Sequence, residues 1–254
     1  MLAPRQDGSL LSPMTYPRAP ITEALIDIRV AQREGLNVEE FRKLAKDFGD
    51  EFGTQNDQFR FTNVIAVGPA AQPIAPIKVG IQFVGNSREK LFQAQIDGWT
   101  FNKLAPYRGW EEEFRDDARK LWHGYRAIAR PLKITRAALR YVNRLDLPAP
   151  VRDLRTYLRT GPDISPDLPQ TLDAFYLQMQ IPQTDVDALL VINMSIVPPP
   201  KEGFVSVVLD LDLFRTADLP QADDELWDCF EKLRSKKNEI FEACITDATR
   251  EFFR

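Results

Sequence analysis

The chain has 254 residues, of which 44% are hydrophobic and 28% are charged, and its formal net charge at pH 7 is −4. This composition is that of a folded protein with a sizeable core, and it excludes a wholly disordered chain. A general binder of duplex DNA takes most of its affinity from clustered positive charge. The chain has no such excess, so nucleic acid remains a partner only through a local basic face.

The composition also bears on the compartment. The longest apolar runs, such as Ala188 to Ile196, have the length of strands and fall far short of the ~20 residues of a membrane helix. The N-terminus lacks the apolar core of a signal peptide. Cys229 and Cys244 share one helical stretch, in which their separation of 15 residues spans ~22 Å and forbids a disulfide. We therefore expect a cytoplasmic protein without a membrane segment.

The first predicted elements follow a proline-rich N-terminus. Residues 1–20 hold four prolines and predict an extended lead-in. Ala24 to Val30 contains a face of alternating apolar side chains, which predicts a strand. Asn37 and Glu40 have the spacing of a capping box, and the apolar residues behind them predict a short helix up to Phe52. The pattern then predicts strands at Phe59–Val67, Ile77–Val84 and Lys90–Phe101, and a long helix from Trp110 to Ile128 that ends before Pro131.

The same order of elements recurs after residue 131. No proline or glycine interrupts residues 223–254, so the last helix is expected to run ~48 Å to the end of the chain. Before it, the pattern predicts a strand at Ala137–Leu147, a short helix at Val151–Leu158, and strands at Ala174–Ile181, Ala188–Val197 and Phe204–Phe214.

These elements predict an α+β fold of two similar halves, residues 21–131 and 132–254. Each half would be a strand, a short helix, three antiparallel strands and a long helix, with the helices packed on one face of the sheet. The residue-level match between the halves is weak. The alternative is a single antiparallel sheet to which helices are added in this order by chance.

Four short segments carry a resemblance to a known family. They are PITEALIDIR from Pro20, YRGW from Tyr107, ALRYVNR from Ala138 and FEACITDATREF from Phe241. Together they resemble a sporadically distributed family of bacterial proteins of about this length that lacks an assigned biochemical function. The resemblance covers nearly the whole chain from Tyr16 onwards. It implies a patchy bacterial distribution, of the kind seen for genes on mobile elements, and it supplies no catalytic residue.

The residues offer little support for common catalytic devices. His123 is the only histidine, it falls within a predicted helix off the main apolar stripe, and no serine stands in a Gly-x-Ser-x-Gly pattern. Cysteine and histidine spacings for zinc and glycine-rich phosphate loops are also absent from the sequence. We therefore predict no catalytic residue and no cofactor. A magnesium site that uses only carboxylates, with Asp210 and Asp212 as candidates, is the metal site that the composition leaves open.

The most suggestive charges lie on the predicted central strand. Arg136, Arg140 and Arg144 alternate onto one face of it, and Asp210 and Asp212 share a face of the last strand. One interpretation is that arginines and aspartates pair across neighbouring strands and add modest stability. The other is that three guanidinium groups bind phosphate or carboxylate, either in a small-ligand cup or on a nucleic acid.

Two phenylalanines near the end of the chain suggest a second surface. Phe252 and Phe253 follow charged residues, and exposed aromatic side chains at a terminus would cost solubility. They either fold back onto the core of the first half or contact a partner protein or a second copy of the chain.

The sequence as a whole therefore favours a non-enzymatic interaction protein with a protein partner or a homodimer, because the common catalytic devices are missing. Two alternatives remain. One is a nucleic-acid-binding saddle lined by the arginine strand, by analogy with TATA-binding proteins. The other is a small-ligand protein or an enzyme with an arginine–aspartate cup.

Overall fold

The computed structural model describes residues 16–61 and 75–254. In them, nine strands form one antiparallel sheet in the order β2-β3-β4-β5-β1-β6-β9-β8-β7. This confirms the predicted α+β class. The strands are β1 (Ile21–Ala31), β2 (Thr54–Arg60), β3 (Ile77–Val84), β4 (Lys90–Gln95), β5 (Gly98–Leu104), β6 (Lys133–Pro148), β7 (Tyr176–Gln183), β8 (Ala188–Val197) and β9 (Phe204–Arg215).

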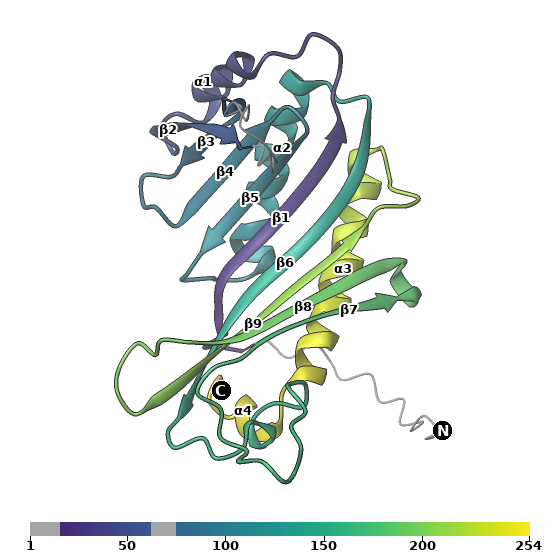
Figure 1. Cartoon of the computed structure of the whole chain (residues 1–254). Coiled ribbons are helices and arrows are strands. Elements are labelled where there is room, and N and C mark those ends of the chain that lie inside the picture. Colours follow the sequence, from purple (N-terminus) through teal and green to yellow (C-terminus); the bar gives the residue numbers. More distant parts are fainter. Residues whose placement is uncertain (1–15, 62–74) are drawn as a thin grey trace, which may run out of the picture.

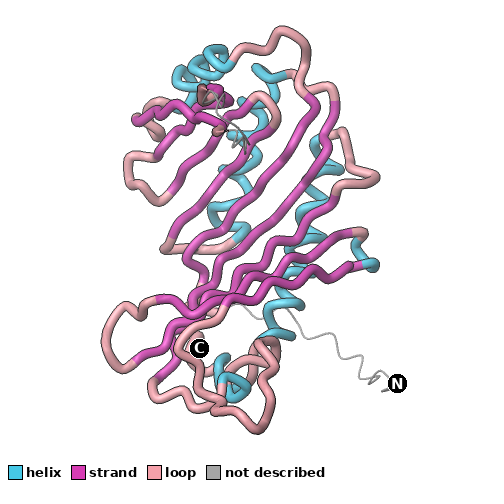
Figure 2. Tube along the Cα trace, in the orientation of Figure 1, coloured by secondary structure: helices cyan, strands magenta, loops and turns pink. Residues whose placement is uncertain are grey.

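The two longest helices pack against the same side of the sheet, as Figures 1 and 2 show from the opposite side. Helix α2 lies against β5, and helix α3 lies against β6 and β9. No helix in the described ranges is long and apolar enough to cross a membrane. The helical segments are η1 (Val38–Leu44), α1 (Ala45–Phe48), η2 (Trp110–Phe114), α2 (Arg115–Ala129), η3 (Leu154–Thr156), η4 (Thr184–Val186), α3 (Asp223–Cys244) and α4 (Asp247–Arg250).

A continuous hydrophobic core fills the layer between the sheet and the helices. In β1, Ala24, Ile26, Ile28 and Val30 point into this layer, because alternate side chains of a strand share a face. The interlayer packing is strongly aromatic near α2, where the rings of Trp99 and Trp122 meet edge to face at 5.9 Å. The side chains between these inward positions, Glu23, Leu25, Asp27 and Arg29, form the other face of the sheet.

The first half differs from the prediction in its strands. The predicted strand Lys90–Phe101 is a hairpin of β4 and β5, because Ile96 and Asp97 form a two-residue turn before Gly98. Four strands therefore follow the short helix where three were expected. The predicted strand Phe59–Val67 is replaced by β2, which begins earlier, and its part from residue 62 onwards lies outside the described residues.

The predicted capping box at Asn37 is confirmed. The side chain of Asn37 accepts a hydrogen bond from the Glu39 backbone N–H at 2.9 Å, and the backbone N–H of Asn37 donates to the Glu40 carboxylate at 3.0 Å. The segment that it starts is a 3₁₀ helix that continues into one turn of α-helix. Of the predicted N-terminal lead-in, residues 1–15 lie outside the described part of the chain.

Two helix predictions in the second half are wrong. The predicted helix Val151–Leu158 is reduced to the single 3₁₀ turn η3, because Leu158 pairs with Ile245 in an isolated antiparallel bridge. The same bridge ends α3 at Cys244, since Ile245 adopts an extended conformation with φ −112° and ψ 158°. The last helix therefore does not reach the end of the chain, and only the short α4 follows.

Both predicted halves contribute to the one sheet. The boundary near residue 131 falls between α2 and β6, and β1 pairs with β6 at the centre, where Ile26 lies opposite Leu139. Strand β5 flanks β1 on one side of this central pair, and β9 flanks β6 on the other. The similarity of the halves as duplicated units stays a prediction.

Candidate functional site

The open face is the surface formed by the strand side chains that point away from α2 and α3. No helix of the described chain covers it (Figure 1). The strands alternate so that apolar residues face the helices, whereas the outward residues are charged, polar or, as at Leu25 and Val191, apolar. Strands β1, β6 and β9 carry charged side chains on this face, which include Glu23, Asp27, Arg29, Arg136, Arg140, Arg144, Asp146, Asp210 and Asp212.

Arg140 and Asp210 form a two-point ion pair on this face. Nε and one terminal nitrogen of Arg140 donate to the two carboxylate oxygens of Asp210 at 2.8 and 2.7 Å. In the strand register Arg140 lies opposite Asp212, so its side chain reaches diagonally across β9. Asp210 is 4% exposed and also accepts a hydrogen bond from Asn193 of β8 at 3.0 Å. The hydrogen bond to Asp210 raises the pKa of Arg140 further, so this guanidinium is permanently charged.

Arg136 links two carboxylates on different strands. It donates to Asp27 of β1 at 2.7 Å and to Asp212 of β9 at 2.9 Å, and its guanidinium lies 4.3 Å from the ring centroid of Phe214. Burial raises the pKa of the Asp212 carboxyl, and the charges of Arg136 and Arg140 oppose that rise. One oxygen of Asp212 is buried and has no hydrogen-bond partner among the described residues.

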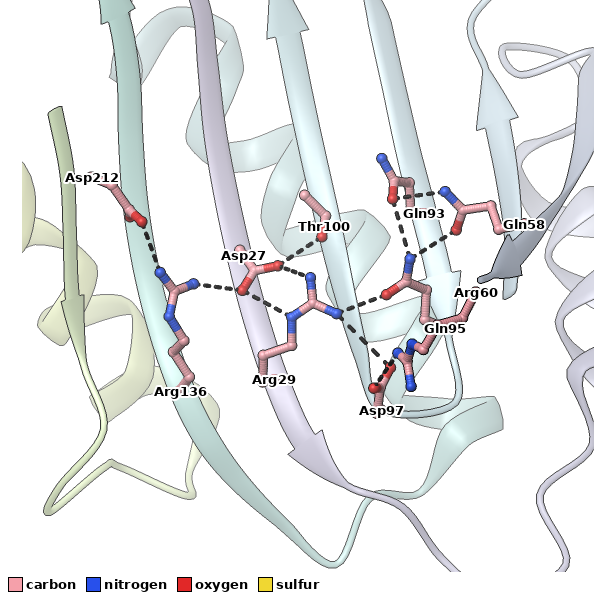
Figure 3. A network of polar contacts seen from close by, with 10 residues as sticks. All are labelled: Asp27, Arg29, Gln58, Arg60, Gln93, Gln95, Asp97, Thr100, Arg136 and Asp212. Atoms are coloured by element: carbon pink, nitrogen blue, oxygen red, sulfur yellow. Dashed lines mark hydrogen bonds and ion pairs between the residues drawn. The ribbon is translucent and has the colours of Figure 1, made fainter. Parts of the chain in front are cut away.

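The polar network continues from Asp27 towards the β2 edge (Figure 3). Asp27 is 5% exposed, and its carboxylate accepts hydrogen bonds from Arg29 at 3.1 and 2.5 Å and from Thr100 at 2.9 Å. Arg29 also donates to Gln95 of β4 at 2.7 Å. Gln95 in turn donates to Gln58 of β2 at 3.0 Å. A continuous chain of polar contacts therefore runs from β9 to β2.

Arg144 stands apart from the other predicted site residues. It pairs with Asp146 on its own strand at 2.9 Å and donates to the backbone oxygen of Pro198 at 2.9 Å. The structure therefore brings Arg136, Arg140, Asp210 and Asp212 together, as the pairing interpretation predicted. The expectation that Arg144 joins them is wrong, because it lies further along β6, opposite Val208, and has a nearer carboxylate.

Sequence reasoning missed Asp27 as part of this site. Its position on the polar side of the first strand was visible from the alternation of apolar residues. The sequence did not show which strand lies next to β1. That strand is β6, and this pairing brings Asp27 within reach of Arg136.

The two terminal phenylalanines lie against other parts of the second half and the N-terminal segment. Phe253 is 6% exposed, and its ring meets those of Tyr16 and Phe241 with centroids 5.5 and 6.2 Å apart. Phe252 is half-buried and lies 5.9 Å from the ring of Tyr157. These contacts differ from the expected packing on the core of the first half. Because Phe253 is buried, the predicted contact with a partner protein now concerns only the exposed part of the Phe252 side chain.

A buried lysine lies on the opposite, helix-covered side of the sheet. Lys237 of α3 points its Nζ at the ring of Tyr141, and burial lowers the pKa of this amine to about 7. The neighbouring charge of Arg234 acts in the same direction on that pKa. The sequence signal was a lysine at helical spacing from Leu233 and Ile240, on a stripe that is otherwise apolar.

A cavity of about 220 Å³ lies elsewhere, in the loops after β6. It is lined by residues between Asp153 and Leu172, and none of the five predicted arginines and aspartates borders it. It therefore gives no support to a small-ligand cup built on those residues.

The charged side chains of the open face are held mainly by one another. Its arginines are held in ion pairs and are poor proton donors, because guanidinium groups do not release a proton in proteins. His123 is exposed on α2, on the helix side of the molecule. Among the described residues, no group of three or more histidine, cysteine, aspartate and glutamate side chains is placed to hold a metal ion.

No protein-family model matches the sequence, and no curated protein matches it. The resemblance to a sporadically distributed bacterial family therefore stays a prediction.

Proposed function

We propose that this chain is a non-enzymatic interaction protein that binds a protein partner with its open face. The observation that supports this proposal is the charge-balanced polar network across the sheet, on a face that no described helix covers. Side chains that are already held by one another lose little conformational freedom on binding, which lowers the entropic cost of association.

A protein partner fits this surface better than a nucleic acid. The arginines of β6 are already neutralised: Arg136 by Asp27 and Asp212, Arg140 by Asp210, and Arg144 by Asp146. A phosphate would have to compete with these carboxylates, in a chain whose net charge is −4. Non-specific affinity for nucleic acids depends on free positive charge, and this face offers little of it.

The test uses two substitutions that add a long charged side chain to the open face without breaking an ion pair. Leu25 of β1 and Val191 of β8 are half-buried open-face residues, and we choose Leu25→Lys and Val191→Lys. His123→Lys is the matched control, because it adds the same charge to the helix side. The tagged chain and each variant are used to capture proteins from the native host, and the captured protein is then purified and titrated against all four.

We expect one protein to bind the parent chain and the His123 variant, with affinity at least about tenfold lower for the two open-face variants. Equal affinity for all four chains would place the contact elsewhere. Filter binding with single-stranded and duplex DNA at two salt concentrations tests the alternative. Salt-dependent DNA binding that the two lysine substitutions strengthen would favour the nucleic-acid saddle instead.

A further inference from the structure

The two edges of the sheet differ in how they are protected against pairing with another strand. An exposed strand edge presents unpaired backbone groups, and proteins usually protect it with charges, bulges or a covering segment. Strand β2, at one edge, carries Asp57 and Arg60 and has a register shift between Gln58 and Phe59. It is therefore protected both by charge and by an irregular backbone.

Strand β7, at the other edge, lacks both protections. Its eight residues Tyr176–Gln183 include no charged side chain, and its pairing with β8 runs from end to end without a register shift. Tyr176 is 71% exposed, and Gln180 is exposed as well. Pro182 removes one backbone donor near the end of the strand, which leaves the rest of the edge regular.

We propose that β7 is a homodimer interface at which two copies of the chain pair their β7 strands antiparallel. A twofold axis perpendicular to the sheet would relate the copies, so that each β7 meets itself. Alternate residues of a strand share both a face and a direction of backbone hydrogen bonding. Every register that matches the outward backbone groups of two β7 strands therefore also pairs odd-numbered residues with odd-numbered ones, so that the side of β7 that carries Leu177, Met179 and Ile181 meets the same side of the other copy.

A second copy suits this edge because of its charge and its pattern. With no formal charge on β7, its side chains bring no charge repulsion to the pairing, and the glutamines of the outward face, Gln178 and Gln180, lie on the same face as those of the other copy. The axis keeps both helix layers on the same side. The two nine-stranded sheets then continue into one another, and the open face of one copy extends into that of the other. This inference does not depend on what the open face binds.

The test places charges of both signs at one position of the edge. Gln180 is exposed, and its side chain has no hydrogen bond among the described residues. Gln180→Lys and Gln180→Glu each bring like charges together across the twofold axis. An equimolar mixture of the two variants brings opposite charges together. Asn56→Lys adds an exposed lysine to the protected edge strand β2 and serves as the matched control.

Light scattering over a range of micromolar concentrations measures the mass, and thermal denaturation confirms that each variant is folded. We expect the parent and the Asn56 variant to reach twice the monomer mass of 29.1 kDa. We expect the dissociation constant of each Gln180 variant alone to rise at least about tenfold, and the mixture to recover a dimer. A monomeric parent chain would overturn the proposal. So would a dimer that both Gln180 variants retain, because that dimer would use another surface.

Discussion

Nζ of Lys237 lies 3.5 Å from the centroid of the Tyr141 ring, in the layer between α3 and the sheet. The hydroxyl groups of Tyr141 and Tyr107 share a hydrogen bond of 2.9 Å beside it, and burial raises the pKa of both phenols, that of Tyr107 to about 12. No carboxylate of the described residues forms an ion pair with Lys237. The aromatic face favours the protonated amine, whereas burial disfavours it.

Replacing this lysine should stabilise the fold most at low pH. Burial lowers the pKa of Lys237 in the folded state to about 7 from an ordinary 10.5. Between these values the unfolded chain holds a proton that the folded chain releases, so the destabilising effect of this group is full below pH 7 and shrinks as pH rises towards 10.5. We expect Lys237→Met to raise the free energy of unfolding by about 1–3 kcal/mol at pH 6. That gain should shrink by pH 9, as urea denaturation at both pH values would show; an equal gain at both would contradict this assignment.

Asp27 should be the most sensitive carboxylate of the open face. It accepts hydrogen bonds from Arg29, Arg136 and Thr100, so Asp27→Asn leaves two arginines without their shared counter-ion. We expect a loss of about 1–3 kcal/mol in the free energy of unfolding, since both arginines keep partial access to water. Asp224→Asn is the control: Asp224 also pairs with an arginine, but it is almost fully exposed, and its loss should cost less than about 0.5 kcal/mol. Equal losses in the free energy of unfolding for Asp27→Asn and Asp224→Asn would contradict the role given to Asp27 in the polar network.

Gly124 permits the close approach of α1 to α2. A methyl group at this position would lie 2.5 and 2.8 Å from two ring carbons of Phe48, which is itself buried and packed edge to face against Phe92. Alanine normally stabilises the middle of a helix relative to glycine by about 1 kcal/mol. Here we expect Gly124→Ala to destabilise the protein by about 1–2 kcal/mol, because the ring has little room to move. The control is His123→Ala, at an exposed position one residue away, and thermal denaturation of both variants provides the comparison. If both variants were stabilised, the close contact between Gly124 and Phe48 would be refuted.

Phe253 should contribute to the core despite its place at the end of the chain. Its ring packs between Tyr16 and Phe241, so Phe253→Ala should cost about 2–4 kcal/mol in the free energy of unfolding. Leu132→Ala removes a side chain that is 73% exposed and should change stability by less than about 0.5 kcal/mol. Denaturant titration of both variants measures the difference. If Phe253→Ala left the free energy of unfolding unchanged, Phe253 would not belong to the core, and a contact with a partner would be favoured instead.

The sequence predicted those features of the fold that depend on near neighbours. Alternation located β8 at Ala188–Val197 to the residue, and the Asn37 capping box identified the start of η1. Both signals act within a few residues, so the local pattern contains them. The turn at Ile96 and Asp97 was missed, because the apolar residues on either side made the segment resemble one long strand.

The errors came from contacts between distant parts of the chain. No residue near Ile245 has the signature of a helix end, and its extended conformation depends on Leu158. The site divides in the same way. Alternation was enough to place Arg140 and Asp210 on the outward faces of their strands. The ion pair between them follows from β6 lying beside β9. The contribution of Asp27 required the β1–β6 pairing, which no local pattern reports.

That central pairing has a consequence during protein synthesis. Strand β1 ends at Ala31, whereas β6 begins only at Lys133. At ~5–20 residues per second, β6 leaves the ribosome several seconds after β1. During this interval β5 is the neighbour that β1 has acquired, and the other edge of β1 presents unpaired backbone groups in the middle of the future sheet. A nascent chain arrested before residue 133 would therefore expose this edge, which makes it a substrate for chaperones and prone to aggregation.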